Sequence, residues 1–128
     1  MRKIIAVLLL LGLAAPASAA EPKTERGIAA VYVLKLVGHR TTSGEKLDRA
    51  PLTAAHRSLP FGTIIEVTNR ANGRKAMVRI NDRGPHRRRI LLDLSPAAAE
   101  ALGIGRRNTA PVELRVTEKP SRAKVDER

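Results

Sequence analysis

The chain has 128 residues, no cysteine and a formal net charge of +12 at pH 7. Disulfides and a lipidated cysteine are therefore excluded, and the length allows one modest core rather than several domains. The strongly basic balance favours an anionic partner.

The first twenty residues have the pattern of a secretory signal. Arg2 and Lys3 precede an apolar run over residues 4–13, and a small-residue segment with an A-x-A site ends at Ala20. The run is too short for a stable membrane span, although an uncleaved anchor is the alternative. We expect residues 1–20 to be removed, which takes away two positive charges and leaves +10 on a periplasmic protein with no stable membrane anchor. For such a protein, cell wall is a more plausible anionic partner than nucleic acid.

Short apolar segments between turn residues predict a small β-structure in the rest of the chain. The expected strands cover residues 28–36, 63–68, 75–80, 90–94 and 109–116. Asn72-Gly73 predicts a tight hairpin between the second and third of these. We also expect a single helical turn over residues 50–56, and a helix over residues 97–102 that Ser95 caps and Gly103 ends. Residues 118–128 are expected to be a disordered basic tail.

One strand ends in residues that bear on function. After the apolar residues 75–80 come Asn81-Asp82-Arg83-Gly84-Pro85, which favour a turn. Asp82 is therefore expected at a strand end, where a rigid element aims it at a cleft. A long polar loop over residues 38–48 carries Glu45 and Asp48, and His56 follows a short apolar segment. These four side chains are the predicted site.

Several motifs occur together in one order. They are TTSGEKLD (residues 41–48), LTAAH (52–56), LPFGT (59–63), VRINDRGP (78–85) and ILLDLSPAAAEALGI (90–104). In this order and spacing the chain resembles the rare lipoprotein A-like family over about residues 27–116. The resemblance implies an all-β domain over residues 27–117, a six-stranded double-psi β-barrel with one or two short helices. It also implies a lytic transglycosylase acting on peptidoglycan glycan strands, with a 1,6-anhydro product.

The resemblance also implies roles for particular residues. The family's proposed active-site positions match Glu45, Asp48, His56 and Asp82, and Asp93 matches an acid of related barrels. We expect Asp82 to be the general acid and base, protonated near neutral pH with help from a nearby carboxylate. Arg83 would oppose this unless its side chain points away. The residues expected to contact the sugar are Thr53, Asn81, Arg83, Tyr32 and Asp93.

Each assignment has a structural alternative. Asp82 would cap its own turn, His56 would be a hydrogen-bonded structural residue, Glu45 a loop charge and Asp48 a local turn-former. Tyr32, the only tyrosine, would simply pack. Arg87–Arg89 would contact substrate carboxylates or form a solvated charge run.

The remaining expectations concern ligands and the competing function. No H-x-x-H or H-E-x-x-H spacing occurs, so we expect no metal and no cofactor. The expected partner is peptidoglycan, not nucleic acid, and the protein is expected to be a monomer. The alternative function is a non-catalytic, expansin-like wall-binding module.

Overall fold

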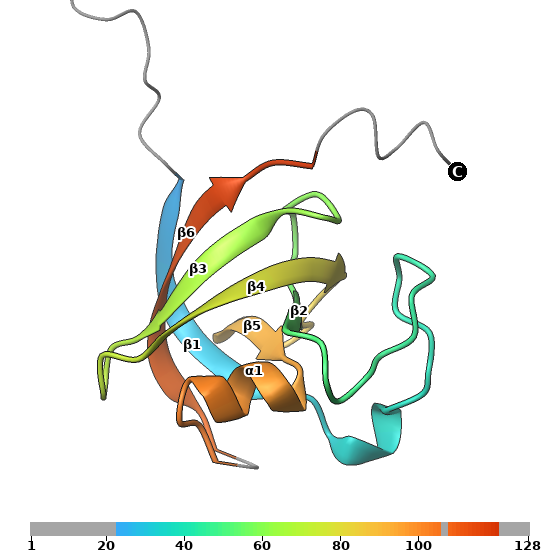
Figure 1. Cartoon of the computed structure of the whole chain (residues 1–128), viewed down its shortest axis with the longest axis horizontal. Helices are drawn as coiled ribbons and strands as arrows, with labels where there is room; N and C mark the ends of the chain where they lie inside the picture. The colour runs from blue at the N-terminus through green and yellow to red at the C-terminus, as the bar shows by residue number, and fades with distance from the viewer. Residues whose placement is uncertain (1–22, 106–107, 121–128) are drawn as a thin grey trace, which may run out of the picture.

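The computed structural model describes residues 23–105 and 108–120, so the predicted signal at residues 1–20 lies outside the described residues, as does most of the predicted tail. Six strands close into one barrel in the order β1-β5-β2-β4-β3-β6 (Figure 1). The strands are β1 (Thr24–Val31), β2 (Thr53–Ala55), β3 (Ile64–Asn69), β4 (Lys75–Asp82), β5 (Ile90–Leu94) and β6 (Ala110–Glu118). A 3₁₀ helix, η1 (Leu34–Leu36), and one α-helix, α1 (Pro96–Ala101), complete the described elements.

The barrel mixes parallel and antiparallel pairs. β1 is parallel to β5 and β2 is parallel to β4, whereas the other four pairs are antiparallel. Closure of the sheet on itself leaves no unpaired edge strand. The predicted all-β, six-stranded barrel with one or two short helices is confirmed.

The core fills the barrel from alternate positions of its strands. In β3 the side chains of Ile65 and Val67 are fully buried, and in β6 those of Val112 and Leu114 are. α1 covers one end with the buried Ala98 and Ala99. Ser95 caps this helix, as predicted, by accepting a hydrogen bond from the Ala98 amide at 3.3 Å.

One predicted element is wrong, and another has different ends. Residues 53–55 form β2 rather than a helical turn, because small residues there allow close pairing with both β4 and β5. The first strand was expected over residues 28–36, but it begins at Thr24, where it pairs with β6. It ends at Val31, the last residue that pairs with β5. Leu34–Leu36 consequently forms η1, none of whose residues is buried.

β4 runs past the predicted turn start and carries a bulge. Ala54 pairs with Ile80 and Ala55 pairs with Asp82, which leaves Asn81 as the extra residue. Ile80 and Asn81 are both buried, so the alternation shifts by one position and Asp82 is half-buried. A bulge re-aims the side chains that follow it, and here it sets the orientation of Asp82.

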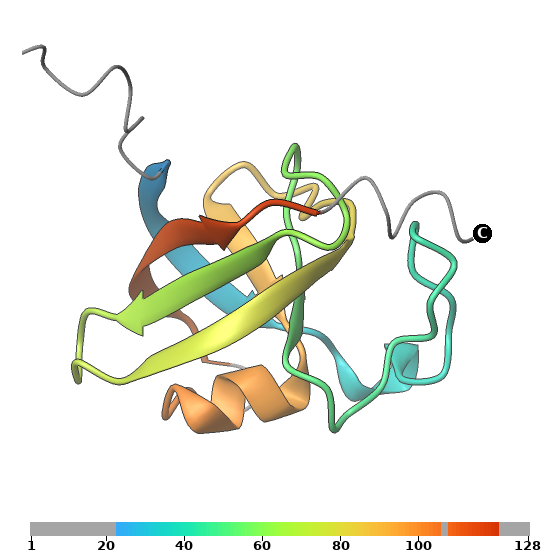
Figure 2. The ribbon, with the colours of Figure 1, turned by 45° about the horizontal axis from the view of Figure 1, so that its top comes forward.

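The polar loop stands at the Asp82 end of the barrel. In both ribbon views, η1 and the loop leading toward β2 lie on the side of the barrel where β4 ends, opposite the β3–β4 hairpin (Figure 2). Neither described helix is long and apolar enough to cross a membrane.

Candidate active site

Asp82 is the point where three segments meet. Tyr32, just after β1, donates its hydroxyl to Asp82 Oδ2 at 2.5 Å. The backbone amides of Thr42, in the polar loop, and Arg83 each donate to Oδ1 at 2.8 Å. Tyr32 therefore does more than pack, and the loop contributes a backbone group rather than an acid.

These donors decide the ionisation of Asp82. Burial alone raises the pKa of its carboxyl group, but the hydrogen bonds from Tyr32, Thr42 and Arg83 outweigh burial and lower it below the usual range. The pKa of Tyr32 is raised by burial and by its bond to Asp82, so the phenol keeps its proton. Asp82 is accordingly a carboxylate at neutral pH, in contrast to the protonated acid that the sequence predicts.

Arg83 directs its charge elsewhere. Its guanidinium donates to the carbonyls of His56 and Leu59 at 3.0 and 2.7 Å, and it stacks 4.2 Å from the centre of the Phe61 ring. The side chain clamps the turn that follows β2. It does not pair with the Asp82 carboxylate.

His56 reaches Asp82 through its backbone only. Its amide donates to the Asp82 carbonyl at 3.2 Å. Its ring is buried, and Nδ1 accepts from the amides of Ser58 and Leu59, both at 3.0 Å, while Nε2 faces the Glu25 carboxylate at 3.4 Å. Burial lowers the pKa of His56, although Glu25 partly offsets this, so the imidazole is neutral with its proton on Nε2. These contacts match the structural alternative for this residue.

Glu45 is part of an ion pair beside the site. Its two oxygens accept from the two terminal nitrogens of Arg79 at 2.7 Å each, a bidentate geometry. Arg79 precedes Asp82 by three residues on β4. The pair therefore ties the polar loop, and with it the Thr42 amide, to the strand that carries Asp82. Asp48 is exposed and accepts from the Ala50 amide at 3.4 Å, as a local turn-former does.

Asp93 lies on the other side of β2 from Asp82. Ala55 pairs with Asp82 on β4 and with Asp93 on β5, so the three residues form a row across three strands. Two strand spacings of about 4.8 Å separate the ends of this row, which places the two Cα atoms roughly 10 Å apart. Residues directly opposite in a ladder share one face of the sheet, so both carboxyl groups stand on the same face.

The surroundings of Asp93 differ from those of Asp82. Its side chain is 19% exposed, and its buried Oδ1 has no hydrogen-bond partner among the described residues. Arg87 approaches Oδ1 only to 3.9 Å. Burial raises the pKa of Asp93, the charge of Asp82 adds to this, and Arg87 opposes it.

Two of the expected sugar contacts lie inside the fold. Thr53 and Asn81 are each 2% exposed. The Thr53 amide donates to Ser95 Oγ at 3.2 Å, which links β2 to the start of α1. The sequence pattern also gave no sign of the Thr42 amide or of Arg79, because a backbone donor carries no sequence signature and an arginine in an alternating strand resembles an ordinary exposed residue.

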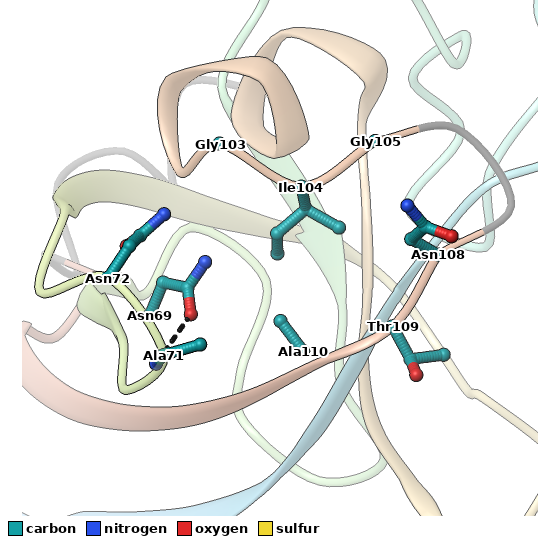
Figure 3. Close-up of a pocket in the computed structure, with 9 residues that line it drawn as sticks. All are labelled: Asn69, Ala71, Asn72, Gly103, Ile104, Gly105, Asn108, Thr109 and Ala110. Atoms are coloured by element: carbon teal, nitrogen blue, oxygen red, sulfur yellow. Dashed lines mark hydrogen bonds between the residues drawn. The ribbon is translucent and has the colours of Figure 1, made fainter.

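Two hollows of the described surface have neither aspartate in their linings. One, of about 380 Å³, lies beside the β3–β4 hairpin (Figure 3). Its Asn69 amide is engaged internally, with Oδ1 accepting from Ala71 and Nδ2 donating to the Leu102 carbonyl. A larger one, of about 730 Å³, lies between η1 and α1 and includes Tyr32 in its lining. Among residues 23–105 and 108–120, no three His, Cys, Asp or Glu side chains are grouped to hold a metal ion.

Comparison with known proteins places this arrangement in a family. Residues 24–114 match the family model described as lytic transglycolase. The chain is 48% identical over 95 residues to a probable endolytic peptidoglycan transglycosylase RlpA of Aquifex aeolicus, covering 74% of this chain and 42% of that protein. It is 43% identical over 101 residues to the endolytic peptidoglycan transglycosylase RlpA of Vibrio cholerae, covering 77% and 38%. The chain thus spans less than half the length of these relatives.

Solved structures show the same barrel at lower identity. An expansin of Clavibacter michiganensis matches with a TM-score of 0.60 at 22% identity, over 77% of this chain and 52% of the expansin. The Streptomyces papain inhibitor matches with a TM-score of 0.59 at 20% identity, over 77% and 98%. These likenesses concern the fold alone. From the match over residues 24–114, the chain belongs to the lytic transglycolase family of rare lipoprotein A-like double-psi β-barrels.

Proposed function

We propose that this protein is an exported peptidoglycan lytic transglycosylase that cleaves the bond between N-acetylmuramic acid and N-acetylglucosamine and leaves a 1,6-anhydro end. The observation that carries the proposal is the outward-facing Asp82, held as a carboxylate by three donors from three different segments. A charged side chain fixed this firmly at a strand end is pre-organised for chemistry. The activity given in the names of the relatives supports the substrate class.

The reaction requires a base rather than a bound water. The 6-hydroxyl group of the muramyl residue attacks its own anomeric carbon, and its proton needs an acceptor. Asp82 supplies this acceptor. Its negative charge also stabilises the positive charge that develops on the sugar as the glycosidic bond breaks. Tyr32 and the Thr42 amide hold the carboxylate in place.

The charge around the site suits an acidic glycan. Arg57 and Arg87 lie close enough to Asp93 to affect its ionisation, and both belong to the basic side of the site. Muramyl residues and their peptide stems carry carboxylates, so a cationic rim raises the local concentration of the polymer. Arg57 is held in position by donating to the carbonyls of Arg87 and Ile90 at 2.7 and 2.6 Å.

The deciding experiment is a digest of purified sacculi with the chain lacking residues 1–20. Mass spectrometry of the soluble products should show anhydromuropeptides, and Asp82→Asn should abolish them while keeping the fold. Products with ordinary reducing ends would instead indicate a hydrolase. Binding to sacculi with no soluble product would favour the expansin-like module. Export is tested separately. The full chain is expressed, and the product in the periplasmic fraction should begin after Ala19 or Ala20.

A further inference from the structure

We infer that Asp93 is the proton donor of the site and that the two aspartates divide the work, with Asp93 as the acid and Asp82 as the base. The inference deepens the proposed function and rests on it. It starts from the row Asp82–Ala55–Asp93, which sets both carboxyl groups on one face of the sheet about 10 Å apart at their Cα atoms. Ala55 is buried yet lies outside the core cluster, as expected for a small residue covered on that outer face.

The surroundings of the two carboxyl groups favour opposite ionisation states. Asp82 accepts three hydrogen bonds, all of which favour its charged form. Asp93 has a buried oxygen with no hydrogen-bond partner among the described residues, a position that penalises a charge. When two titratable groups in one site are pushed in opposite directions, the environment assigns the acid and the base.

The groups that face Asp93 come from several elements. From the segment before β5, Arg87 and His86 favour its ionised form, as does Arg57 from the segment after β2. Asp82 on β4 opposes ionisation, and burial does so most strongly. Tyr32 also senses the charge of Asp93, which places its hydroxyl in range of both acids. The net effect raises the pKa of Asp93, so its carboxyl group holds a proton more readily than that of Asp82 does.

The resulting step is balanced. Asp93 gives its proton to the glycosidic oxygen as the bond to the muramyl anomeric carbon breaks, and the electron pair leaves with O4 of N-acetylglucosamine. The 6-hydroxyl oxygen forms the new bond to the same carbon, and its proton passes to Asp82. Neither water nor a cofactor is consumed, and proton exchange with solvent returns both aspartates to their starting states.

The test compares two substrates with three variants. The substrates are sacculi and a GlcNAc–MurNAc disaccharide bearing 4-nitrophenolate, a leaving group that needs no proton. Asp93→Asn should lose about 100-fold or more in rate on sacculi but retain most of its rate on the nitrophenyl substrate. Asp82→Asn should lose activity on both. Glu113→Gln, which changes a carboxylate on β6 that pairs with Arg26, is the matched control and should behave like wild type.

Several results would overturn the inference. Suppose that wild type digests both substrates. If Asp93→Asn is then fully active on sacculi, or is equally impaired on both substrates, the assignment of Asp93 as proton donor fails while the proposed function stands. If wild type yields no anhydro product from either substrate, the proposed function fails and takes the assignment with it. Should Asp93→Asn not fold, carboxyl ¹³C NMR on wild type decides the matter: Asp93 must titrate at higher pH than Asp82, and the reverse order would refute it.

Discussion

Replacing Tyr32 by phenylalanine isolates the strongest contact at Asp82. The change removes one oxygen and keeps the ring that packs after β1. The lost bond is a hydroxyl-to-carboxylate contact of 2.5 Å in a partly buried setting. Hydrogen bonds to charged groups contribute about 1.5–3 kcal/mol, and one pKa unit corresponds to about 1.4 kcal/mol. Because Asp82 is half-buried, water replaces part of the lost bond, so its pKa should rise by about one unit.

The pH dependence of anhydro-product formation measures this shift. Asp82 must be ionised to accept a proton, so kcat/KM falls as the pH drops through its pKa. In Tyr32→Phe the acidic limb of the profile should move up by about one pH unit, with the plateau retained in large part. The basic limb should not move, because Tyr32 holds no bond to Asp93.

The same contact predicts a stability effect with a definite sign. The pKa of Asp82 is lower in the folded state than in the unfolded state. Its contribution to stability is therefore present above the unfolded pKa of about 4 and is lost as the pH falls through the folded pKa. The difference in the free energy of unfolding between wild type and Tyr32→Phe, measured by urea unfolding, should therefore become smaller as the pH falls through this acidic range.

A control variant separates this effect from general loss of a hydroxyl. Thr117→Val removes a hydroxyl that donates to the Ile64 carbonyl at 3.1 Å on β6. It should leave both limbs of the profile in place. An unshifted acidic limb in a folded Tyr32→Phe protein would refute the reasoning, since it would mean that Tyr32 does not set the ionisation of Asp82.

Three further changes have measurable outcomes. Glu45→Gln weakens a pair that is about one-third exposed, which costs at most about 1 kcal/mol, so the Thr42 amide should exchange with solvent up to about fivefold faster. His56→Ala strips the acceptor from two amides, that of Leu59 buried and that of Ser58 partly buried, and should cost about 2–4 kcal/mol in urea unfolding, whereas His56→Asn should recover about half. Because the folded pKa of His56 is lowered, its contribution holds above the unfolded pKa of about 6.5 and fades as the pH falls through the folded value. Leu102→Ala, at a fully buried position, should cost about 2–5 kcal/mol in the same assay without moving either pH limb.

Local chemistry was enough to predict much of the fold. The Asn72-Gly73 hairpin, the Ser95 cap and the strand over residues 90–94 rest on turn, capping and apolar residues whose preferences hold without tertiary contacts. The segment over residues 53–55 did not follow from local preference. Three small residues become a strand only because β4 and β5 lie on either side of them, and that pairing is decided by the whole barrel.

The acidic residues of the candidate site could be predicted from the sequence, but the hydrogen-bond donors that hold them could not. The end of a strand in NDRGP pointed to Asp82, because turn residues after an apolar run are visible in sequence. The bulge at Asn81, which orients that acid, depends on register with β2 and leaves no local mark. The imidazole of His56 turned toward Glu25, thirty-one residues away, a choice that only the packed structure makes.

The hydrogen bonds that each carboxyl group accepts, rather than its burial, distinguish the two aspartates. Asp82 and Asp93 are both partly buried on one face, and burial alone raises the pKa of each. Two of the three donors to Asp82 come from outside the sheet, from the residue after β1 and from the polar loop tied down by Glu45 and Arg79. The barrel therefore supplies a pair of similar carboxyl groups, and the segments around it make them different. The ionisation of Asp82 accordingly depends on a loop that could loosen without unfolding the barrel.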